Sequence, residues 1–414
     1  MLDKKMVFLI SGLYVFSGVG NAGINLMKFG ANIVINFDGQ LLNEPIGCIY
    51  VDSVYLARLA PGEIQSGRVI MDTTRFSKRL AGKQRFRVGI FIEGFSGNEI
   101  IRKIQAGNFS YGGEGYNYTG ETFIETALQD FVFRRFGELR KIRAKIKADG
   151  ALWKADLTSV FMLPDEDRAK LCGFRAPQTK GEGTPLPPKG GSRQLPPYFD
   201  WTNKDGINWM TAVKDQGVGA RTCWAFGTVG QVEALINIAT NTPNPNFDLA
   251  EQTLVSDCCR YCGNCNGGMH FWALMYIRNH GIPVETIDPY TAMNGPCCKR
   301  PSKLWKITSY HCVTWQSADE NAIKTALENH PLSTSVYADT LWYSYTGGVY
   351  SYTDSLRIPD HCVVFVGWND NDEGGTKTWK IKNSWGDDWG ENGYMRLIRG
   401  QNNRCGWYTF SAEY

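Results

Sequence analysis

A stretch rich in proline and glycine divides the chain between residues 174 and 199. It holds six Pro and four Gly, and such a composition favours an extended linker over packed helix or sheet. About 220 residues follow it, which is enough for a domain with its own core. The sequence therefore predicts separate N-terminal and C-terminal parts, and no internal repeat is evident.

Composition indicates a globular protein. Of the 414 residues, 43% are hydrophobic and 21% are charged, so the chain can bury a sizeable core. The net charge of +3 gives no electrostatic argument for a nucleic-acid or membrane partner. No apolar run reaches the ~18 residues that a spanning helix needs. We therefore expect no nucleic-acid partner and no stable membrane span.

Two features indicate export. Residues 1–22 place Lys4 and Lys5 before an apolar run and then small residues, which is the order of a signal peptide, although a buried strand would give a similar pattern. Seven of the 12 Cys lie between Cys258 and Cys312, which favours an oxidising compartment. We expect a secreted protein, or one of the secretory pathway or a lysosome-like compartment.

The N-terminal part changes its hydrophobic period once. Residues 23–118 contain runs with an apolar side chain at every second position, as from Phe86 to Ile92, which predicts a β-rich accessory domain of unassigned role. From about 122 to 148 the spacing becomes three or four, which predicts an amphipathic helix. Its apolar stripe comprises Leu128, Val132, Phe136, Leu139, Ile142 and Ile146.

The other face of this helix is basic. From Arg134 to Lys147 it carries seven basic residues and one acid. A solvated face, or one that docks on an acidic protein surface, is favoured over a helix for nucleic acid or anionic membrane.

The C-terminal part contains the elements of a thiol catalyst. Cys223 follows a Gly-containing loop and begins a predicted helix, whose dipole is expected to lower the pKa of the thiol. His361, 138 residues later, is a candidate base before a predicted strand. Asn383 follows another predicted strand and would orient the imidazole. This order and spacing are those of papain-type proteases.

Residues 195–414 resemble a papain-family, cathepsin-like cysteine peptidase. The matching blocks are Gln216-Gly217, Cys223-Trp-Ala-Phe226, Cys265-Asn-Gly-Gly268, Asp360-His361, Asn383-Ser-Trp-Gly-Asp-Asp-Trp-Gly-Glu-Asn-Gly-Tyr394 and Cys405-Gly406. The resemblance implies an α+β, papain-like two-lobed fold, with a helical left lobe and a β-barrel-like right lobe. It implies no cofactor and no catalytic metal.

The resemblance also assigns catalytic roles. Cys223 would be the nucleophile, His361 its base and Asn383 the residue that orients the base. Trp385 would shield that hydrogen bond from water. Gln216 would donate to the oxyanion, together with the backbone N–H of Cys223.

By the same resemblance, eight residues would contact substrate: Gly267, Gly268, Met269, Ser335, Pro359, Asp360, Trp385 and Phe410. Four of these, Met269, Ser335, Pro359 and Phe410, would line the pocket for the second residue before the scissile bond. None of the four is charged, and Phe410 would shorten the pocket. We expect Val, Leu or Pro there rather than Arg or a very large aromatic side chain.

The chain departs from the family pattern before the nucleophile. Six residues, from Gly217 to Thr222, stand where the family has five, and none of them is Cys. The loop must therefore bulge, and Cys265 lacks its usual disulfide partner. Arg221 is an unusual neighbour for a thiolate, and would either lower its pKa or face solvent.

A cysteine cluster allows two interpretations. Cys259, Cys262 and Cys265 are spaced like zinc ligands. Three disulfides are favoured over zinc, and the connectivity is open. The six candidates are Cys258, Cys259, Cys262, Cys265, Cys297 and Cys298.

Residues 119–173 complete the predicted organisation. The stretch from Trp153 to Gly173 resembles the end of an inhibitory prosegment, followed by a linker at 174–194 and the peptidase domain at 195–414. The helix is expected to dock its stripe on the protease. Residues 153–163 are expected to run through the cleft against the substrate direction.

The predicted function is that of a cysteine endopeptidase made as a latent precursor. Its partners would be protein or peptide substrates and its own prosegment. The alternatives are a transpeptidase that uses the same Cys–His pair and a catalytically silent binding protein with this fold.

Overall fold

The computed structural model describes residues 25–29, 32–36, 41–72, 83, 85–112, 115–176, 184–185, 194–298, 301–352, 358–400 and 405–414. The predicted signal peptide and most of the predicted linker lie outside these residues. The chain forms two compact units, residues 1–141 and 142–414. No helix among the described residues is long and apolar enough to cross a membrane.

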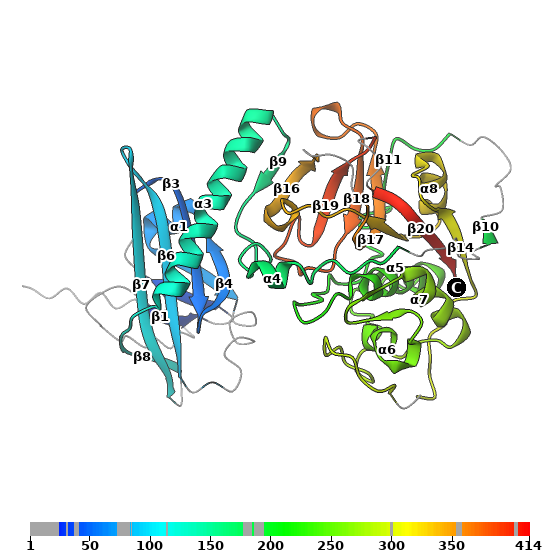
Figure 1. Cartoon of the computed structure of the whole chain (residues 1–414), viewed down its shortest axis with the longest axis horizontal. Coiled ribbons are helices and arrows are strands. Elements are labelled where there is room, and N and C mark those ends of the chain that lie inside the picture. Colours follow the sequence, from blue (N-terminus) through cyan, green and yellow to red (C-terminus); the bar gives the residue numbers. More distant parts are fainter. Residues whose placement is uncertain are drawn as a thin grey trace, which may run out of the picture. The chain divides into compact units, whose positions relative to one another are not determined.

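The N-terminal unit is rich in β-structure, as predicted. An antiparallel sheet has the strand order β4-β3-β6-β7-β8, and a smaller one the order β1-β2-β5 (Figure 1). The elements are β1 Asn25–Phe29, β2 Asn32–Asn36, β3 Asn43–Val51, β4 Val54–Leu59, α1 Pro61–Ser66, β5 Arg68–Asp72, β6 Arg85–Ser96, β7 Glu99–Gly112 and β8 Gly115–Glu121. Alternating side chains of β6, including Val88, Ile90 and Ile92, enter the core of this unit.

Helix α3, Thr126–Asp149, corresponds to the predicted amphipathic helix. Its N-terminal half packs on the five-stranded sheet: the Phe133 ring centroid lies 6.1 Å from that of Phe91 on β6, and Arg140 pairs with the buried Glu93 at 3.1 Å. The expectation that the apolar stripe docks on the protease is therefore wrong for this half. Val132, Phe136 and Leu139 of the predicted stripe are buried, whereas its other three residues are half-buried and Arg135, counted on the basic face, is buried. Periodicity also does not say which surface covers the stripe.

Basic residues of α3 form ion pairs with acidic residues that lie close to them in the sequence. Arg134 pairs with Glu138 at 3.4 Å, and Arg143 pairs with Asp156 at 2.9 Å. These contacts, with that of Arg140, show that acids of the same chain pair with part of the basic face.

The C-terminal unit has the two parts expected of a papain-like fold. The helical part consists of α5 Cys223–Ala239, α6 Glu251–Val255, α7 His270–Asn279, and the short elements η1 Asp257–Cys259, β12 Gly263–Asn264 and β13 Gly267–Gly268. The sheet has the order β10-β14-β20-β15-β17-β18-β19-β16-β9, and β11 also pairs with β17. Its strands, helices and turns are β9 Trp153–Ala155, α4 Asp165–Arg168, β10 Thr184–Pro185, β11 Tyr198–Asp200, β14 Ser309–Thr314, α8 Glu320–Leu327, β15 Leu332–Val336, η2 Trp342–Ser344, β16 Tyr345–Tyr350, β17 His361–Asn369, η3 Glu373–Gly375, β18 Thr378–Lys382, β19 Tyr394–Ile398 and β20 Cys405–Glu413.

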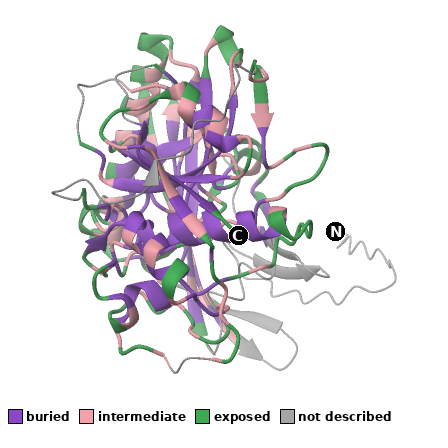
Figure 2. Cartoon of the chain, turned by 90° about the vertical axis from the view of Figure 1, so that its right-hand side faces the viewer, coloured by how far each residue is buried: buried purple, intermediate pink, exposed green. Residues whose placement is uncertain are grey.

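Helix α5 is the central helix of this unit. Every residue from Cys223 to Asn237 is buried (Figure 2), so the helix is buried on all sides and has no solvent-facing polar side. Gly227 allows it to approach β17, because a Cβ at this position would lie 2.6 Å from Sγ of Cys362. This close packing brings the start of α5 near the start of β17, where Cys223 and His361 lie.

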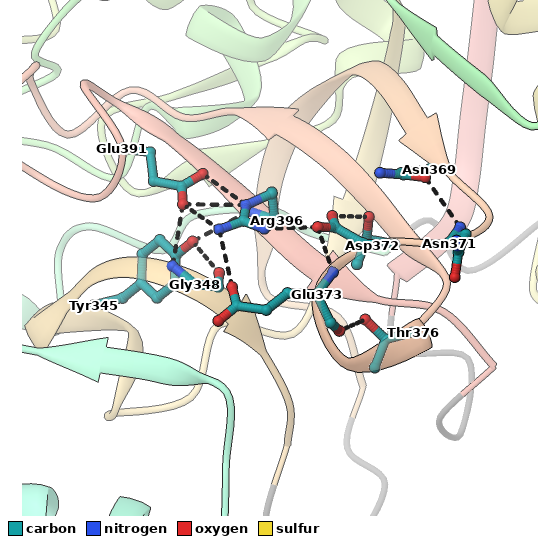
Figure 3. A network of polar contacts seen from close by, with 10 residues as sticks. Tyr345, Gly348, Asn369, Asn371, Asp372, Glu373, Thr376, Glu391 and Arg396 are labelled. Atoms are coloured by element: carbon teal, nitrogen blue, oxygen red, sulfur yellow. Dashed lines mark hydrogen bonds and ion pairs between the residues drawn. The ribbon is translucent and has the colours of Figure 1, made fainter.

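An ion-pair network stabilises β16, the strand that pairs with β9. Arg396 lies at its centre, bonded to Asp372 at 2.7 Å and to Glu391 at 2.9 Å (Figure 3). Glu391 also accepts a hydrogen bond from the backbone N–H of Gly348 on β16, at 3.0 Å. These acids raise the pKa of Arg396. Strand β9 adds to β16 antiparallel, with Trp153 opposite Gly348, so the network fixes the edge that receives the chain N-terminal to the cleft.

Candidate active site

Cys223 is the first residue of α5, as the sequence predicts, and it is fully buried. The expected low pKa is not found in this form. Burial raises the pKa of Cys223 to about 12, and backbone hydrogen bonds involving Cys362 and Gly173 offset this only in part. A helix N-terminus favours a thiolate, but desolvation prevails here because the cleft is covered.

His361 and Asn383 are joined as predicted. Nε2 of His361 lies 2.8 Å from Oδ1 of Asn383. The other ring nitrogen, Nδ1, is buried and makes no hydrogen bond of ordinary geometry within the described parts of the chain. Burial lowers the pKa of His361 to about 4, although Asn383 and the backbone of Leu171 partly counteract it. In this form the thiol and the imidazole are therefore both neutral near pH 7.

Trp385 covers the imidazole. Its ring centroid lies 4.8 Å from that of His361, and the side chain is buried. A buried ring in this position is suited to the role that the resemblance predicts for Trp385, which is to exclude water from the hydrogen bond between His361 and Asn383.

Gln216 points its amide into the cleft. Its Nε2 donates to the carbonyl oxygen of Leu171 at 3.1 Å, while its Oε1 accepts from Oγ of Ser384 at 2.8 Å. The backbone N–H of Gln216 also donates to the Ser384 carbonyl at 2.9 Å. Ser384 thus sets which end of the amide faces a carbonyl oxygen. No role of Ser384 is predicted from the sequence, although this residue lies between Asn383 and Trp385.

Residues 171–175 occupy the cleft. The backbone N–H of Gly173 donates to Sγ of Cys223 at 3.2 Å. Phe174 forms a parallel bridge with Gly268, and on either side of it Gly268 donates to Gly173 and accepts from Arg175, both at 2.9 Å. The segment therefore adds to the edge of the cleft as a short strand.

Two more predicted substrate-binding residues touch this segment. The carbonyl oxygen of Asp360 accepts from the backbone N–H of Phe174 at 2.9 Å, and burial raises the pKa of the Asp360 carboxyl to about 6. A Cβ on Gly267 would lie 2.9 Å from Nε of Arg175. Gly267, Gly268 and Asp360 thus all lie where the chain crosses the cleft.

The cleft-crossing segment lies further along the chain than predicted. Residues 153–163 do not meet Cys223: they begin with strand β9 on β16 and continue to Ser159, whose backbone N–H donates to Asp388 at 3.0 Å. Residues 153–163 are predicted to run through the cleft, whereas the contacts with Cys223 and Gly268 are made by residues 171–175. Main-chain hydrogen bonds fix this register, and they leave little trace in the sequence.

The side chain of Phe174 lies among residues of the predicted specificity pocket. Phe174 lies in one buried cluster with Met269 and Phe410. Its ring centroid is 5.5 Å from that of His270 and 5.3 Å from that of Tyr408. His270 and Tyr408 were not anticipated. This cluster accommodates the benzyl group of Phe174. The range of side chains that fit is therefore wider than the Val, Leu or Pro expected from Phe410 alone.

The other two predicted pocket residues are also buried. Ser335 lies on β15 and donates through Oγ to the Trp407 carbonyl at 2.8 Å. Pro359 is buried immediately before Asp360.

The loop before the nucleophile accommodates its extra residue. Gly217 adopts a φ of +63°, and its N–H donates to Asp215 at 2.8 Å. Arg221 donates from its backbone to the Cys265 carbonyl at 2.8 Å. Its guanidinium neither pairs with the thiol nor simply faces solvent, but donates from Nη1 to the Cys172 carbonyl at 3.1 Å.

The cysteine cluster forms two disulfides, Cys258–Cys297 and Cys259–Cys262. Cys265 and Cys298 are free, so the expectation of three bridges is wrong by one. The zinc interpretation also fails, because Cys259 and Cys262 are bonded to each other. Counting cysteines cannot reveal which thiols come within bonding distance.

The remaining histidines differ in their surroundings. His280 ends α7 and is half-buried. His311 lies on β14, where its Nε2 is 3.0 Å from Oγ of Ser309. His330 is half-buried before β15.

The fold and the site together define a protein of the papain-like thiol protease class in a covered form. A family model described as papain family cysteine protease matches residues 195–412. That match spans more than half of the chain, and the chain belongs to this family.

Relatives and solved structures agree with this assignment. The chain is 34% identical over 226 residues to a cathepsin L-like proteinase of Fasciola hepatica, covering 53% of this chain and 66% of that protein. It is 36% identical over 222 residues to pro-cathepsin H of Bos taurus, covering 52% and 63% respectively. The chain spans 54% of the length of a probable cysteine protease of Arabidopsis thaliana, to which it is 35% identical over 266 residues.

Two similar structures are precursors. The digestive procathepsin L2 proteinase from the larval midgut of Tenebrio molitor superposes with a TM-score of 0.63 at 26% identity, covering 71% of this chain and 96% of that one. The ragweed pollen allergen Amb a 11, a cysteine protease in its proform, gives 0.55 at 27% identity, covering 67% and 86%. These likenesses extend beyond the peptidase domain into the predicted prosegment.

Proposed function

We propose that this protein is a cysteine endopeptidase made as a latent precursor, in which residues 171–175 block the catalytic cleft. The contact between the Gly173 N–H and Sγ of Cys223 carries this proposal. The same segment places the Leu171 carbonyl on the amide of Gln216, so it covers the nucleophile and an oxyanion donor together. The likeness to two proforms supports it.

Catalysis begins when this segment leaves. Water then reaches Cys223 and His361, and the desolvation that keeps both neutral is relieved. Nδ1 of His361 takes the thiol proton, and Oδ1 of Asn383 accepts from Nε2–H of the resulting imidazolium. The product is a thiolate held beside its counter-ion at the N-terminus of α5.

The thiolate then attacks a peptide carbonyl. Gln216 Nε2 and the backbone N–H of Cys223 donate to the developing oxyanion, and one such donor is worth about 3 kcal/mol of the barrier. His361 gives its proton to the leaving amine, which leaves an acyl-thioester on Cys223. Water activated by His361 hydrolyses the thioester and restores the free thiol.

Specificity follows from the pocket that Phe174 fills. We propose that Met269, Ser335, Pro359 and Phe410, joined by His270 and Tyr408, receive the apolar second residue before the scissile bond. Phe174 is the observed occupant, so an aromatic side chain should be accepted as well as Leu or Val.

The precursor is assigned residues 119–173 as prosegment, 174–194 as linker and 195–414 as peptidase domain, after an accessory domain at 23–118. The inhibitory contacts extend to Arg175, at the start of the linker. The disulfide Cys258–Cys297 supports maturation in an oxidising compartment of the secretory pathway.

Thiol labelling tests both parts of the proposal. Full-length protein and protein cut in the linker are treated with an epoxysuccinyl inhibitor, and labelled peptides and peptide hydrolysis are measured. We expect labelling of Cys223 only after cutting, and no labelling or hydrolysis for Cys223→Ala. Cys172→Ser is the matched control, because it removes the neighbouring thiol of the prosegment and should retain both signals. Equal labelling before and after cutting would refute latency, and hydrolysis by Cys223→Ala would refute the nucleophile.

A further inference from the structure

Arg221 is a cation in the cleft whose side-chain hydrogen-bond partner belongs to the blocking segment. Its guanidinium is half-buried and donates to the Cys172 carbonyl at 3.1 Å. Within the described ranges no carboxylate lies within 4.0 Å of it to form an ion pair. Arg168, Arg396 and Arg399 of the same unit all have such partners.

The position of Arg221 relative to the reacting atoms can be read from three consecutive residues. Leu171 contacts Gln216 through its carbonyl oxygen, Cys172 contacts Arg221 through its carbonyl oxygen, and Gly173 contacts Cys223 through its N–H. Each residue spans about 3.5 Å of extended chain. The guanidinium therefore lies within about one residue of both the oxyanion donor and the nucleophile.

The backbone of Arg221 is also fixed. Its N–H donates to the Cys265 carbonyl, and the next residue but one begins α5. A Cβ on Gly173 would lie 2.1 Å from the carbonyl oxygen of Arg221, so the blocking segment passes here without a side chain. The guanidinium thus meets only a neutral carbonyl in the precursor.

We propose that Arg221 is a specificity-determining residue that selects Asp or Glu at the substrate position whose carbonyl is attacked. This inference rests on the proposed function, because the cation becomes available only when residues 171–175 leave. The attacked carbonyl takes the place of the Leu171 oxygen beside Gln216, and its residue then lies next to Arg221. A carboxylate there replaces a neutral acceptor with a charged one, which forms shorter and stronger hydrogen bonds with guanidinium.

Matched fluorogenic peptides test the proposal. Full-length protein is cut in the linker and its active sites are titrated. Hydrolysis is then compared for peptides with Leu at the second position and Glu, Gln, Arg or Ala at the attacked residue. Glu and Gln have nearly the same shape, so the ratio of their kcat/KM values isolates the charge. We expect a ratio of about ten or more, the factor that one charge-assisted hydrogen bond typically supplies.

Variants assign that preference to one side chain. Arg221→Gln should bring the ratio of Glu to Gln close to one while the Ala peptide is still cut. Arg221→Lys should keep part of the preference, since it retains the charge but loses the planar fork. Arg278→Gln, which removes an exposed arginine of α7, should leave the ratio unchanged. Raising the salt concentration should lower the ratio of Glu to Gln for the parent enzyme, which has Arg221, but not for Arg221→Gln.

The outcomes separate this inference from the proposed function. If no peptide of the set is cut, the proposed function and this inference fail together. If peptides are cut but Glu is not preferred over Gln, or if the preference survives in Arg221→Gln, the role of Arg221 alone is overturned. Should Arg221→Gln yield no folded protein, the Arg221→Lys variant decides: a ratio identical to that of the parent would count against selection by the guanidinium geometry.

Discussion

The backbone N–H of Gly173 lies 3.2 Å from Sγ of Cys223 and donates to it. No side chain fits at this crossing, because a Cβ on Gly173 would approach the carbonyl oxygen of Arg221 to 2.1 Å. The nucleophile is therefore covered by main chain, which offers it a backbone N–H donor.

Replacing this glycine should weaken latency. Gly173→Ala must displace the segment or the loop at Arg221, and overpacking of this kind costs about 1–3 kcal/mol. The population of the open form should rise about fivefold or more, measured as the rate at which full-length protein reacts with a thiol-directed inhibitor. Gly137→Ala is the control, since a Cβ there meets nothing within 4 Å. Equal rates for parent and Gly173→Ala would show that the contact does not limit opening.

The catalytic residues should differ in the size of their effects. Cys223→Ala should abolish hydrolysis by the cut enzyme, and His361→Ala should lower kcat by about 10²–10⁴, the usual contribution of a general acid–base. Asn383→Ala should be milder, because Asn383 orients the imidazole without exchanging the proton. Steady-state kinetics on titrated enzyme would measure this order. A larger loss for Asn383→Ala than for His361→Ala would contradict the assignment.

Ser384 should matter through Gln216. Ser384→Ala removes the donor that holds Oε1 of Gln216, so the amide can turn and present oxygen to the oxyanion. We expect a fall in kcat with little change in KM, smaller than the roughly 10²–10³ typical for losing an oxyanion donor, which Gln216→Ala should show. The double variant should be no worse than Gln216→Ala, and additive losses would mean that Ser384 acts elsewhere.

Acid should destabilise the full-length protein between about pH 6.5 and 4. Burial lowers the pKa of His361 and of His270 to about 4, whereas an unfolded histidine titrates near 6.5. In this window the unfolded chain binds protons that the folded chain does not, so stability falls as pH falls. Burial also raises the pKa of the carboxyls of Asp360 (to about 6), Glu251 and Glu285, and these groups act with the opposite sign and reduce the net effect.

Melting temperatures at pH 7 and pH 5 test this balance. The His361→Gln variant lacks the imidazole that titrates in this range. Its melting temperature should therefore fall less between pH 7 and pH 5 than that of the parent. His280→Gln, at the half-buried end of α7, should fall as much as the parent. An unchanged fall in His361→Gln would show that this histidine does not link stability to pH.

The disulfide between Cys258 and Cys297 should stabilise the folded state. Closing this loop, with a sequence separation of 39, is worth about 2–4 kcal/mol in the chain-entropy account. Cys258→Ser should lower the free energy of unfolding by this amount, measured by denaturant titration. Cys298→Ser removes a free thiol beside it and should change stability much less. Peptide mapping that found a bridge to Cys298 or Cys265 would contradict the pairing.

The sequence predicted the parts of the site that consist of side chains with distinctive chemistry. Cys223, His361 and Asn383 lie at the starts or ends of the elements expected from the apolar pattern, and the structure brings their neighbourhoods together. Arg221 was singled out, but its contact with Cys172 could not be anticipated, because it is made to a backbone carbonyl.

Other expectations failed for related physical reasons. The apolar stripe of α3 predicted a buried face. The same pattern is compatible with packing on the β-sheet at Phe91 and with packing on a protease, so it could not distinguish the two. The register of the blocking segment is set by backbone hydrogen bonds at Gly268, and any residue can supply these except proline. Only Gly173 marks the crossing in the sequence, and one glycine among 45 is not a signal.

Residues 171–175 are held at Gly268 by a few backbone hydrogen bonds, so their occupancy of the cleft depends on their covalent connection to the protease. While the chain is continuous, residues 171–175 and the cleft are parts of one molecule, so the block has a fixed effective concentration and is indifferent to dilution. Once the linker is severed, the same hydrogen bonds join two separate molecules, and occupancy follows their concentration. In the proposed precursor, a single cut would thus convert a tethered block into a dissociable one, whose occupancy falls as the protein is diluted.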